Sequence, residues 1–225
     1  MKYMGIDVLN LMQKAKNYNM YLVDLCLAKL NPSTKMLDFG AGCGSIATIL
    51  RDKGFDIECI ELDPDLQSVL KEKEFVVFDN ILGYQDNSIE SIVSFNVFEH
   101  IENDKKVLEE IYKKLKPDGK FFFFVPAYSF LYSEFDRKLG HFRRYDLKPV
   151  VSILEECGFK ILSFEYVDSI GFILALIYKF FRKNGKISIF SILFYDKILL
   201  PITKLTDKFY KKKFGKNLAF VLTKV

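Results

Sequence analysis

The chain is 225 residues long, 50% apolar and 16% aromatic, so it can bury the core of one α/β domain with an elaboration. Its four cysteines are scattered without a CxxC pair, which favours free thiols in a reducing cytoplasm over a disulfide framework. Residues 1–10 lack the basic-then-apolar pattern of a secretory signal peptide, so we expect a cytoplasmic protein.

The net charge of +4 is unevenly distributed along the chain. Residues 1–169 hold 21 Lys and Arg against 27 Asp and Glu, whereas residues 170–225 hold 12 against 2. The first part of the chain is therefore net acidic, and the tail is strongly basic. A basic tail favours an anionic partner.

Strands and helices alternate along most of the chain. We predict a helix over residues 8–30 that ends at Asn31 and Pro32, a strand over 35–39, a helix over 45–53, a strand over 56–63, a helix over 65–73, strands over 75–78 and 88–95, a helix over 104–116, a strand over 120–125, a helix over 146–157, and strands over 160–166 and 217–223. The inner strands are apolar throughout, which is typical of a parallel sheet covered on both faces. The predicted fold is α/β: a Rossmann-like, doubly wound seven-stranded sheet, mostly parallel, with a helical insertion before the last strand.

A glycine-rich turn follows the first strand. Gly40, Gly42 and Gly44 alternate after Asp38, and the next helical pattern begins at Ser45. Glycines let the backbone approach a ligand closely, and the unpaired N–H groups of the first helical turn point into the same space. A dinucleotide site would carry G-x-G-x-x-G, and its pyrophosphate would be repelled by a carboxylate. The spacing therefore favours a different nucleotide-sized ligand, with a ligand-free turn as the alternative.

This D-x-G-x-G-x-G pattern resembles motif I of the class I S-adenosylmethionine (SAM)-dependent methyltransferases, and the likeness covers residues 35 to about 168. Residues 116–120 resemble the family's L-K-P-G-G turn before the fifth strand, with Asp118 in the first glycine position. The resemblance implies that SAM is the cofactor and that the last two strands form an antiparallel edge hairpin.

The resemblance also assigns cofactor-binding residues at the carboxyl ends of the strands, where ligands of such sheets bind. The implied set is Asp38, Gly40, Gly42, Gly44, Glu61, Asp79, Asn80 and Asn96. Asp38 suits the ammonium group of SAM, Glu61 suits the ribose hydroxyls, and Asp79 with Asn80 suits the adenine side. The alternatives are a surface carboxylate for Glu61 and a turn-forming residue for Asp79.

Chemistry on the acceptor side is assigned to four residues beyond the fourth and fifth strands: His100, His141, Arg143 and Arg144. Since SAM carries the activation, the protein mainly positions the acceptor and removes a proton from a hydroxyl. We expect His141 to act as the base, or else to be structural or to orient the substrate. The arginine pair suits a phosphate or carboxylate, unless one of the two pairs with Glu134 or Asp136.

Two finer resemblances concern the acceptor. Residues 125–145 resemble a bacterial branch associated with cell-surface polysaccharides or lipid-linked glycans. Some O-methyltransferases of the superfamily carry E-x-x-E-H after the fourth strand and bind a divalent ion there with a further histidine. This chain has Asn96 in the place of the first acid of that motif, before Glu99 and His100, so we expect no metal.

Between the last two strands lie about fifty residues, far more than a hairpin needs. They hold apolar runs over residues 170–181 and 187–200, a basic turn over 182–186, and a Lys-rich stretch through residue 216. Neither run reaches the roughly 18 residues that span a bilayer. We expect an interfacial helical hairpin on an anionic membrane surface, with a substrate lid or a dimer surface as the alternatives.

The sequence thus predicts a SAM-binding core with an N-terminal helix over residues 1–168, an insertion over 169–216 and a final strand over 217–225. The predicted activity is transfer of a methyl group from SAM to an oxygen of a small-molecule or lipid-linked glycan acceptor, in the cytoplasm at the inner face of the membrane. The alternatives are N- or C-methylation of a lipid-soluble, quinone-like metabolite and a nonenzymatic SAM sensor. A nucleic-acid partner is disfavoured, because the aromatic residues of the tail sit in apolar helical runs.

Overall fold

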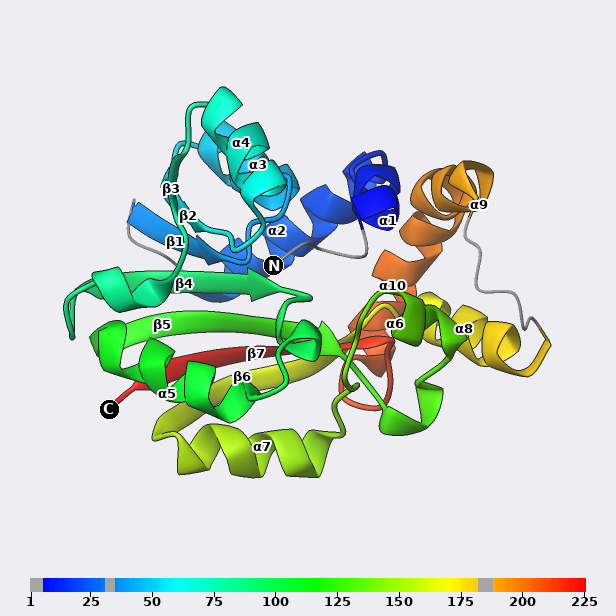
Figure 1. Cartoon of the computed structure of the whole chain (residues 1–225). Helices are drawn as coiled ribbons and strands as arrows, with labels where there is room; N and C mark the ends of the chain where they lie inside the picture. The colour runs from blue at the N-terminus through cyan, green and yellow to red at the C-terminus, as the bar shows by residue number, and fades with distance from the viewer. Residues whose placement is uncertain (1–5, 31–34, 182–187) are drawn as a thin grey trace.

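The computed structural model describes residues 6–30, 35–181 and 188–225. Its centre is a 7-stranded sheet in the order β3-β2-β1-β4-β5-β7-β6 (Figure 1). The strands are β1 (Lys35–Phe39), β2 (Asp56–Ile60), β3 (Val76–Phe78), β4 (Ile89–Phe95), β5 (Leu115–Pro126), β6 (Phe159–Val167) and β7 (Asn217–Lys224). The strand β7 pairs antiparallel with both β5 and β6, and the other pairs are parallel. The predicted α/β fold is confirmed.

Helices cover both faces of this sheet. The helices of the described residues are α1 (Ile6–Met12), α2 (Lys16–Leu30), α3 (Ser45–Asp52), α4 (Pro64–Glu72), α5 (Asp104–Lys114), α6 (Glu134–Lys138), α7 (Leu147–Glu156), α8 (Ser169–Phe181), α9 (Ile189–Phe194) and α10 (Leu200–Tyr210). Figure 1 shows α3 and α4 above the sheet and α5 and α7 below it. The helix α2 packs in the same apolar cluster as α3.

The apolar run in the strand β5 contributes side chains to the apolar clusters on both faces of the sheet. Phe121 and Phe123 belong to the apolar cluster beneath α5 and α7, whereas Phe122 and Phe124 belong to the cluster beneath α2 and α3. None of the four is more than 1% exposed. Because successive side chains of a strand point to opposite faces, a continuous apolar run is what a strand covered on both sides requires.

The order of the strands places a ligand crevice at one end of the sheet. The chain runs outward from β1 to β2 and β3, and then returns to β4 on the other side of β1. The loops after β1 and β4 therefore diverge at the carboxyl ends of the strands, and this is where open α/β sheets bind ligands. Figure 1 shows α6, α8 and α10 gathered beyond the same end of β4 and β5.

Two of the predicted elements differ most from the structure, and the other boundaries shift by at most three residues. The helix predicted over residues 8–30 is broken into α1 and α2, since a tight turn forms in which the N–H of Ala15 donates to the Met12 carbonyl (3.0 Å). The predicted end of that helix at Asn31 and Pro32 lies outside the described residues. The strand β5 begins five residues earlier than predicted because Ile89 pairs with Leu115, and a register shift then absorbs residues 116–119.

The insertion between β6 and β7 consists of α8, α9, a π-helical turn (Tyr195–Leu199) and α10. The sequence did not predict α10, which begins with Pro201 in its first turn, where the missing proline N–H breaks no helical bond. The predicted basic turn over residues 182–186 lies outside the described residues. Among the helices that the structure describes, none is long and apolar enough to cross a bilayer.

Buried carboxylates fasten the insertion to the core. Asp207 accepts hydrogen bonds from the backbone N–H groups of Asp168 and Ser169 and from the Tyr21 hydroxyl, each at 2.8 Å. Asp196 accepts from the N–H of Tyr18 at 2.8 Å. The insertion is therefore bonded to α2 and to the end of β6. The predicted division of the chain at residues 168 and 216 stays a prediction.

Candidate functional site

The glycine turn after β1 adopts a conformation that L-residues with side chains rarely adopt. Gly40 has φ +80° and Gly42 has φ +56°. A Cβ atom on Gly40 would lie 2.4 Å from Val97 Cγ2, so only glycine lets the loop after β4 pack against this turn. The N–H groups of Gly40 and Ala41 both donate to the Ile60 carbonyl, at 2.9 and 3.0 Å. The ends of β1, β2 and β4 are thereby held together.

Glu61 lies directly against the turn, at the end of β2. Its Oε2 accepts from the Gly42 N–H at 2.8 Å, and its Oε1 accepts from the Asp63 N–H at 2.9 Å. The carboxylate is thus fixed by two backbone donors beside the glycine loop. This is the position that the sequence assigned to a ribose-binding acid.

Asp38 is buried in β1, below the same turn. Asp38 is 2% exposed, and its Oδ2 has no hydrogen-bond partner among the described residues. Burial, with a smaller contribution from the charge of Glu61, raises the pKa of Asp38 to about 7. A buried carboxylate oxygen without a donor is costly, and a bound ammonium group would offset that cost. The residues present therefore fit the aminoacyl end of SAM.

The other predicted cofactor residues are less closely joined to the turn. Asp79 and Asn80 are exposed after β3, and Asn80 Nδ2 donates to Asp79 Oδ1 at 2.7 Å. Asn80 Oδ1 also accepts from the Leu82 N–H at 2.9 Å and caps the short turn that follows. Asn96 ends β4 with φ 53° and precedes Val97, which packs on Gly40. The structure brings Asn96 to the glycine loop, whereas Asp79 lies at the end of the outermost strand, β3.

The two histidines of the chain meet on the acceptor side. The rings of His100 and His141 are 4.5 Å apart between centroids and perpendicular to each other. His141 Nδ1 lies 3.1 Å from Asp136 Oδ1, and the Asp136 side chain is fully buried. Burial alone would raise the pKa of Asp136, but hydrogen bonds from His141 and Arg144 and the charge of Arg144 hold that pKa below its usual value. His141 is therefore oriented by a fixed carboxylate.

Glu99 completes this group of side chains, in the short turn after β4. It is 1% exposed, and its Oε2 has no hydrogen-bond partner among the described residues. One ligand atom each from Glu99, His100 and His141 lies within 4.8 Å of the others. Burial raises the pKa of Glu99 to about 8, and burial together with the neighbouring His141 lowers the pKa of His100 to about 4.

The predicted arginine clamp is largely engaged in internal pairs. Arg144 Nη2 lies 2.9 Å from Asp136 Oδ1, and the arginine side chain is 7% exposed. This is the pairing that the sequence left open as the alternative. Arg143 Nη1 lies 2.9 Å from Asp104 Oδ1, with 34% of its side chain exposed. Acceptor binding stays a prediction for Arg143.

Asp136 is the site residue that sequence reasoning missed, since it was considered only as a partner of an arginine. It contacts both His141 and Arg144. A signal was present in the order Ser133 to Asp136, which is typical of a helix start. Ser133 N and Oγ donate to Asp136 Oδ2 at 2.9 and 2.8 Å, and these bonds fix the carboxylate.

The sequence is similar to known methyltransferases. A family model described as "Methyltransferase domain" matches residues 12–164. Phosphoethanolamine N-methyltransferase 2 of Caenorhabditis elegans is 28% identical over 145 residues, which are 57% of this chain and 33% of that protein. An uncharacterized protein of Methanocaldococcus jannaschii is 29% identical over 197 residues, which are 85% of this chain and 80% of that protein.

A solved structure gives the same fold. Phosphoethanolamine N-methyltransferase 2 of Haemonchus contortus, in complex with S-adenosyl-L-methionine, superposes with a TM-score of 0.60 at 22% identity, over 92% of this chain and 52% of that chain. The chain spans about a third of the length of the C. elegans relative. Because the family model covers more than half of the chain, this chain belongs to the methyltransferase-domain family, the class I enzymes that take their methyl group from SAM.

Proposed function

We propose that SAM binds at Asp38, Gly40–Gly44 and Glu61, and that the methyl group goes to an oxygen of a small-molecule acceptor beside His100 and His141. The observation that carries the proposal is the buried Oδ2 of Asp38, which has no hydrogen-bond partner among the described residues and lies below a turn that requires glycine at Gly40. Val97 packs on that loop and the histidine turn follows Val97 directly, so the donor and acceptor sides adjoin.

The protein itself forms no covalent bond in this reaction. When bound, SAM supplies a methyl group that is already activated. A bond forms from the acceptor oxygen to the methyl carbon while the sulfur–methyl bond breaks, S-adenosylhomocysteine leaves, and the hydroxyl proton passes to a base. The side chains of this chain then have two tasks: to hold the acceptor in line with the methyl group and to receive or displace that proton. His141 is positioned for this second task by Asp136.

A second candidate is methyl transfer to nitrogen. The relative from C. elegans is named as a phosphoethanolamine N-methyltransferase, and so is the structure from H. contortus. Neither name mentions a glycan, so the likeness of residues 125–145 to a glycan-associated branch rests on the sequence alone. An amine acceptor would use the same donor site and the same line of approach.

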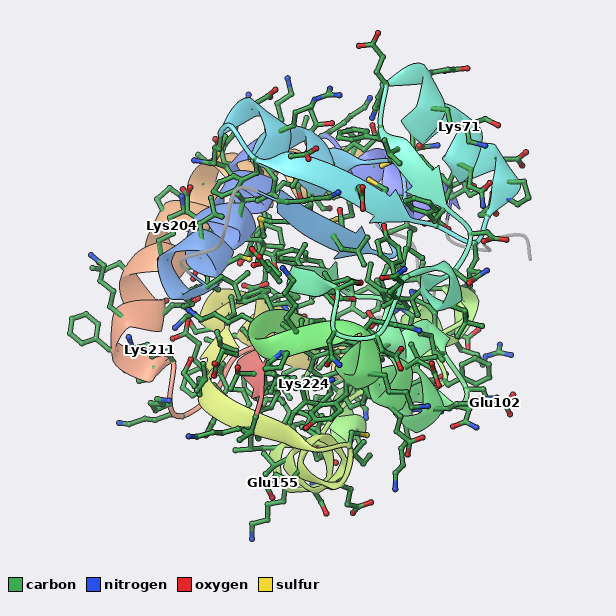
Figure 2. The ribbon with its side chains drawn as sticks, turned by 90° about the vertical axis from the view of Figure 1, so that its left-hand side faces the viewer. Lys71, Glu102, Glu155, Lys204, Lys211 and Lys224 are labelled. Atoms are coloured by element: carbon green, nitrogen blue, oxygen red, sulfur yellow. The ribbon has the colours of Figure 1, made fainter. Side chains whose placement is uncertain are left out.

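We further propose that the insertion lies on an anionic membrane and delivers a lipid-linked acceptor. Its described helices expose many large apolar side chains, namely Ile173, Leu174, Ile177, Phe180, Ile189, Phe190, Phe194, Ile198, Ile202, Leu205, Phe209 and Tyr210. Phe190 is 76% exposed and Phe209 71%. Lysines accompany them, and Figure 2 shows Lys204 on α10 and Lys211 directly after that helix, both at the edge of the molecule. Apolar side chains combined with lysines are what an anionic membrane interface binds.

Product formation tests the activity. The full chain is incubated with SAM and a panel of alcohols, phenols, amines, and extracted lipids and glycans, and the products are examined by mass spectrometry for the gain of one methyl group. An O-methylated product supports the proposal, and an N-methylated product supports the second candidate. SAM binding without any methylated product across the panel would favour the nonenzymatic sensor instead.

A further inference from the structure

The chain has two histidines, and the fold brings both to one buried acid. Glu99 and His100 lie in the turn after β4, whereas His141 follows α6, beyond β5. The three offer ligand atoms that lie within 4.8 Å of one another. Two imidazole nitrogens and one carboxylate oxygen form a set of ligands that first-row transition metals prefer.

Each histidine is oriented by a hydrogen bond to the surrounding protein. His141 Nδ1 is bonded to Asp136 Oδ1, which leaves Nε2 for a ligand. His100 hydrogen-bonds to the backbone of Gly140. Metal-binding histidines almost always have such partners, because a carboxylate or carbonyl on one ring nitrogen fixes the tautomer and raises the basicity of the other. The partners of a metal site are therefore present together with its ligands.

Glu99 supplies the independent observation. Its Oε2 is buried and has no hydrogen-bond partner among the described residues. A carboxylate oxygen without a partner at 1% exposure costs free energy unless the group takes up a proton, accepts a hydrogen bond or meets a cation. The positive charge of Arg144 affects Glu99, but this guanidinium is bonded to Asp136. A cation between Glu99 and the two rings would pair with all three groups.

We propose that Glu99, His100 and His141 bind a divalent transition-metal ion on the acceptor side of the site. The motif after β4 predicted no metal, because Asn96 stands where a first acid was expected. In the structure His141 supplies the further histidine, so three ligands remain without the first acid. Three protein ligands leave open positions, as in catalytic metal sites, and an acceptor oxygen can occupy one of them.

The proposed ion deepens the proposed function and rests on it. A bound divalent ion lowers the pKa of a coordinated hydroxyl and fixes its direction. His141 would then act as a ligand rather than as the free base that the sequence predicted. The acceptor would bind through oxygen, so the ion favours a hydroxyl over an amine.

Metal binding is measured on the full chain after treatment with a chelator. Zn²⁺ titration calorimetry should show one site, which Glu99→Gln and His141→Ala each weaken by at least tenfold. Asp136→Asn, which removes the partner of His141, should weaken it by about 10–100-fold. Glu102→Gln is the matched control: it removes the same charge from an exposed side chain three residues away (Figure 2), and should leave the affinity unchanged.

Cobalt distinguishes this site from the buried thiols. Co²⁺ bound to nitrogen and oxygen ligands gives visible d–d absorption without the strong near-ultraviolet band of a cobalt–thiolate bond. This spectrum in the wild-type chain, lost in His141→Ala, supports the site even if another variant fails to fold. Absence of one-site Zn²⁺ binding in the wild type, affinity unchanged in both ligand variants, or a thiolate band would overturn it.

Two further measurements separate this inference from the proposed function. SAM binding and methyl transfer are followed on the chelator-treated chain. If this chain binds SAM and transfers the methyl group, and added Zn²⁺ does not bind to it, the proposed function stands and the metal site fails. If SAM does not bind with or without Zn²⁺, the proposed function itself fails.

Discussion

Asp38 combines a cost in stability with the function proposed for it. At 2% exposure its carboxyl group has lost nearly all contact with water, and burial raises its pKa to about 7. The unfolded chain ionises this group near its ordinary value of 3.8. The contribution of Asp38 to stability is therefore greatest below pH 3.8 and is lost as the pH rises through about 7.

Asp38→Asn should accordingly stabilise the ligand-free chain more at pH 8 than at pH 5. One pKa unit corresponds to about 1.4 kcal/mol, so the pH-dependent part of the gain is on the order of 2–4 kcal/mol. Thermal unfolding of both chains across this pH range measures it. Asp79→Asn is the control, because Asp79 is exposed at the end of β3. A difference in melting temperature that does not change with pH would contradict the account.

For single residues, the sequence predicts which polar side chains lie near the site but not which side chains they contact. The sequence identified His100, His141, Arg143 and Arg144 as polar residues beyond the strands. It could not show that Arg144 is bonded to Asp136, because a contact between a loop and a short helix depends on tertiary packing. The loop after β4 and the segment after β5 are separate in sequence, so only the fold could bring Glu99 to His141.

At the scale of elements, strands were predicted better than helices. Apolar runs such as Phe121–Phe124 are short, aromatic and preceded by a turn, and their length and residue types favour a strand over a buried helix. The break between α1 and α2 has no proline or glycine to mark it, since residues 13–15 are Gln, Lys and Ala. The sequence does not predict the helix α10, because Pro201 and the many lysines after it are typical of the end of a helix. The buried side chains of Leu200, Thr203 and Asp207 give that helix its inner face.

The exposed faces of α8, α9 and α10 make a testable prediction about membranes. In vesicle co-sedimentation, the chain should bind anionic vesicles better than neutral ones, and binding should fall at high salt, because screening weakens the electrostatic part. Lys211, Lys212 and Lys213 changed together to Glu should reduce binding. Phe190→Ser with Phe209→Ser should reduce it at both salt concentrations, because these side chains are 76% and 71% exposed.

Leu162→Ser serves as the control for those apolar changes, since Leu162 is 48% exposed on β6, outside the insertion. Equal, negligible recovery with both vesicle types at low salt would indicate a soluble lid or a contact between copies of the chain. Those are the two alternatives that the sequence left open for the insertion.

At the scale of the whole molecule, the proposed SAM-binding part and the insertion differ in net charge and in their place along the chain. The net acidic residues 1–169 carry the glycine loop and the histidine cluster, and the basic residues 170–225 carry the insertion and the last strand. The sheet order places the insertion helices α8 and α10 beyond the same strand ends as the proposed acceptor site (Figure 1). A surface that binds lipid would therefore lie beside the site that receives the methyl group.

The central claim is that SAM binds at the glycine loop, and titration calorimetry tests it most directly. The wild-type chain should bind SAM at one site. Gly42→Val should abolish binding, because a β-branched residue is strained at φ +56° and its Cβ would lie 3.3 Å from Leu9 Cδ2. The turn that bonds Glu61 would then have to shift. Glu61→Ala should weaken binding by about 1–3 kcal/mol through the loss of the ribose hydrogen bonds.

Gly54→Asn is the matched control in this titration. Gly54 also has a positive φ, of +91°, but it lies before β2, at the opposite end of the sheet, and nothing stands within 4 Å of its Cβ position. Asparagine tolerates that backbone region, so this variant should bind SAM as the wild type does. A SAM affinity that is the same in wild type, Gly42→Val and Glu61→Ala would contradict the account.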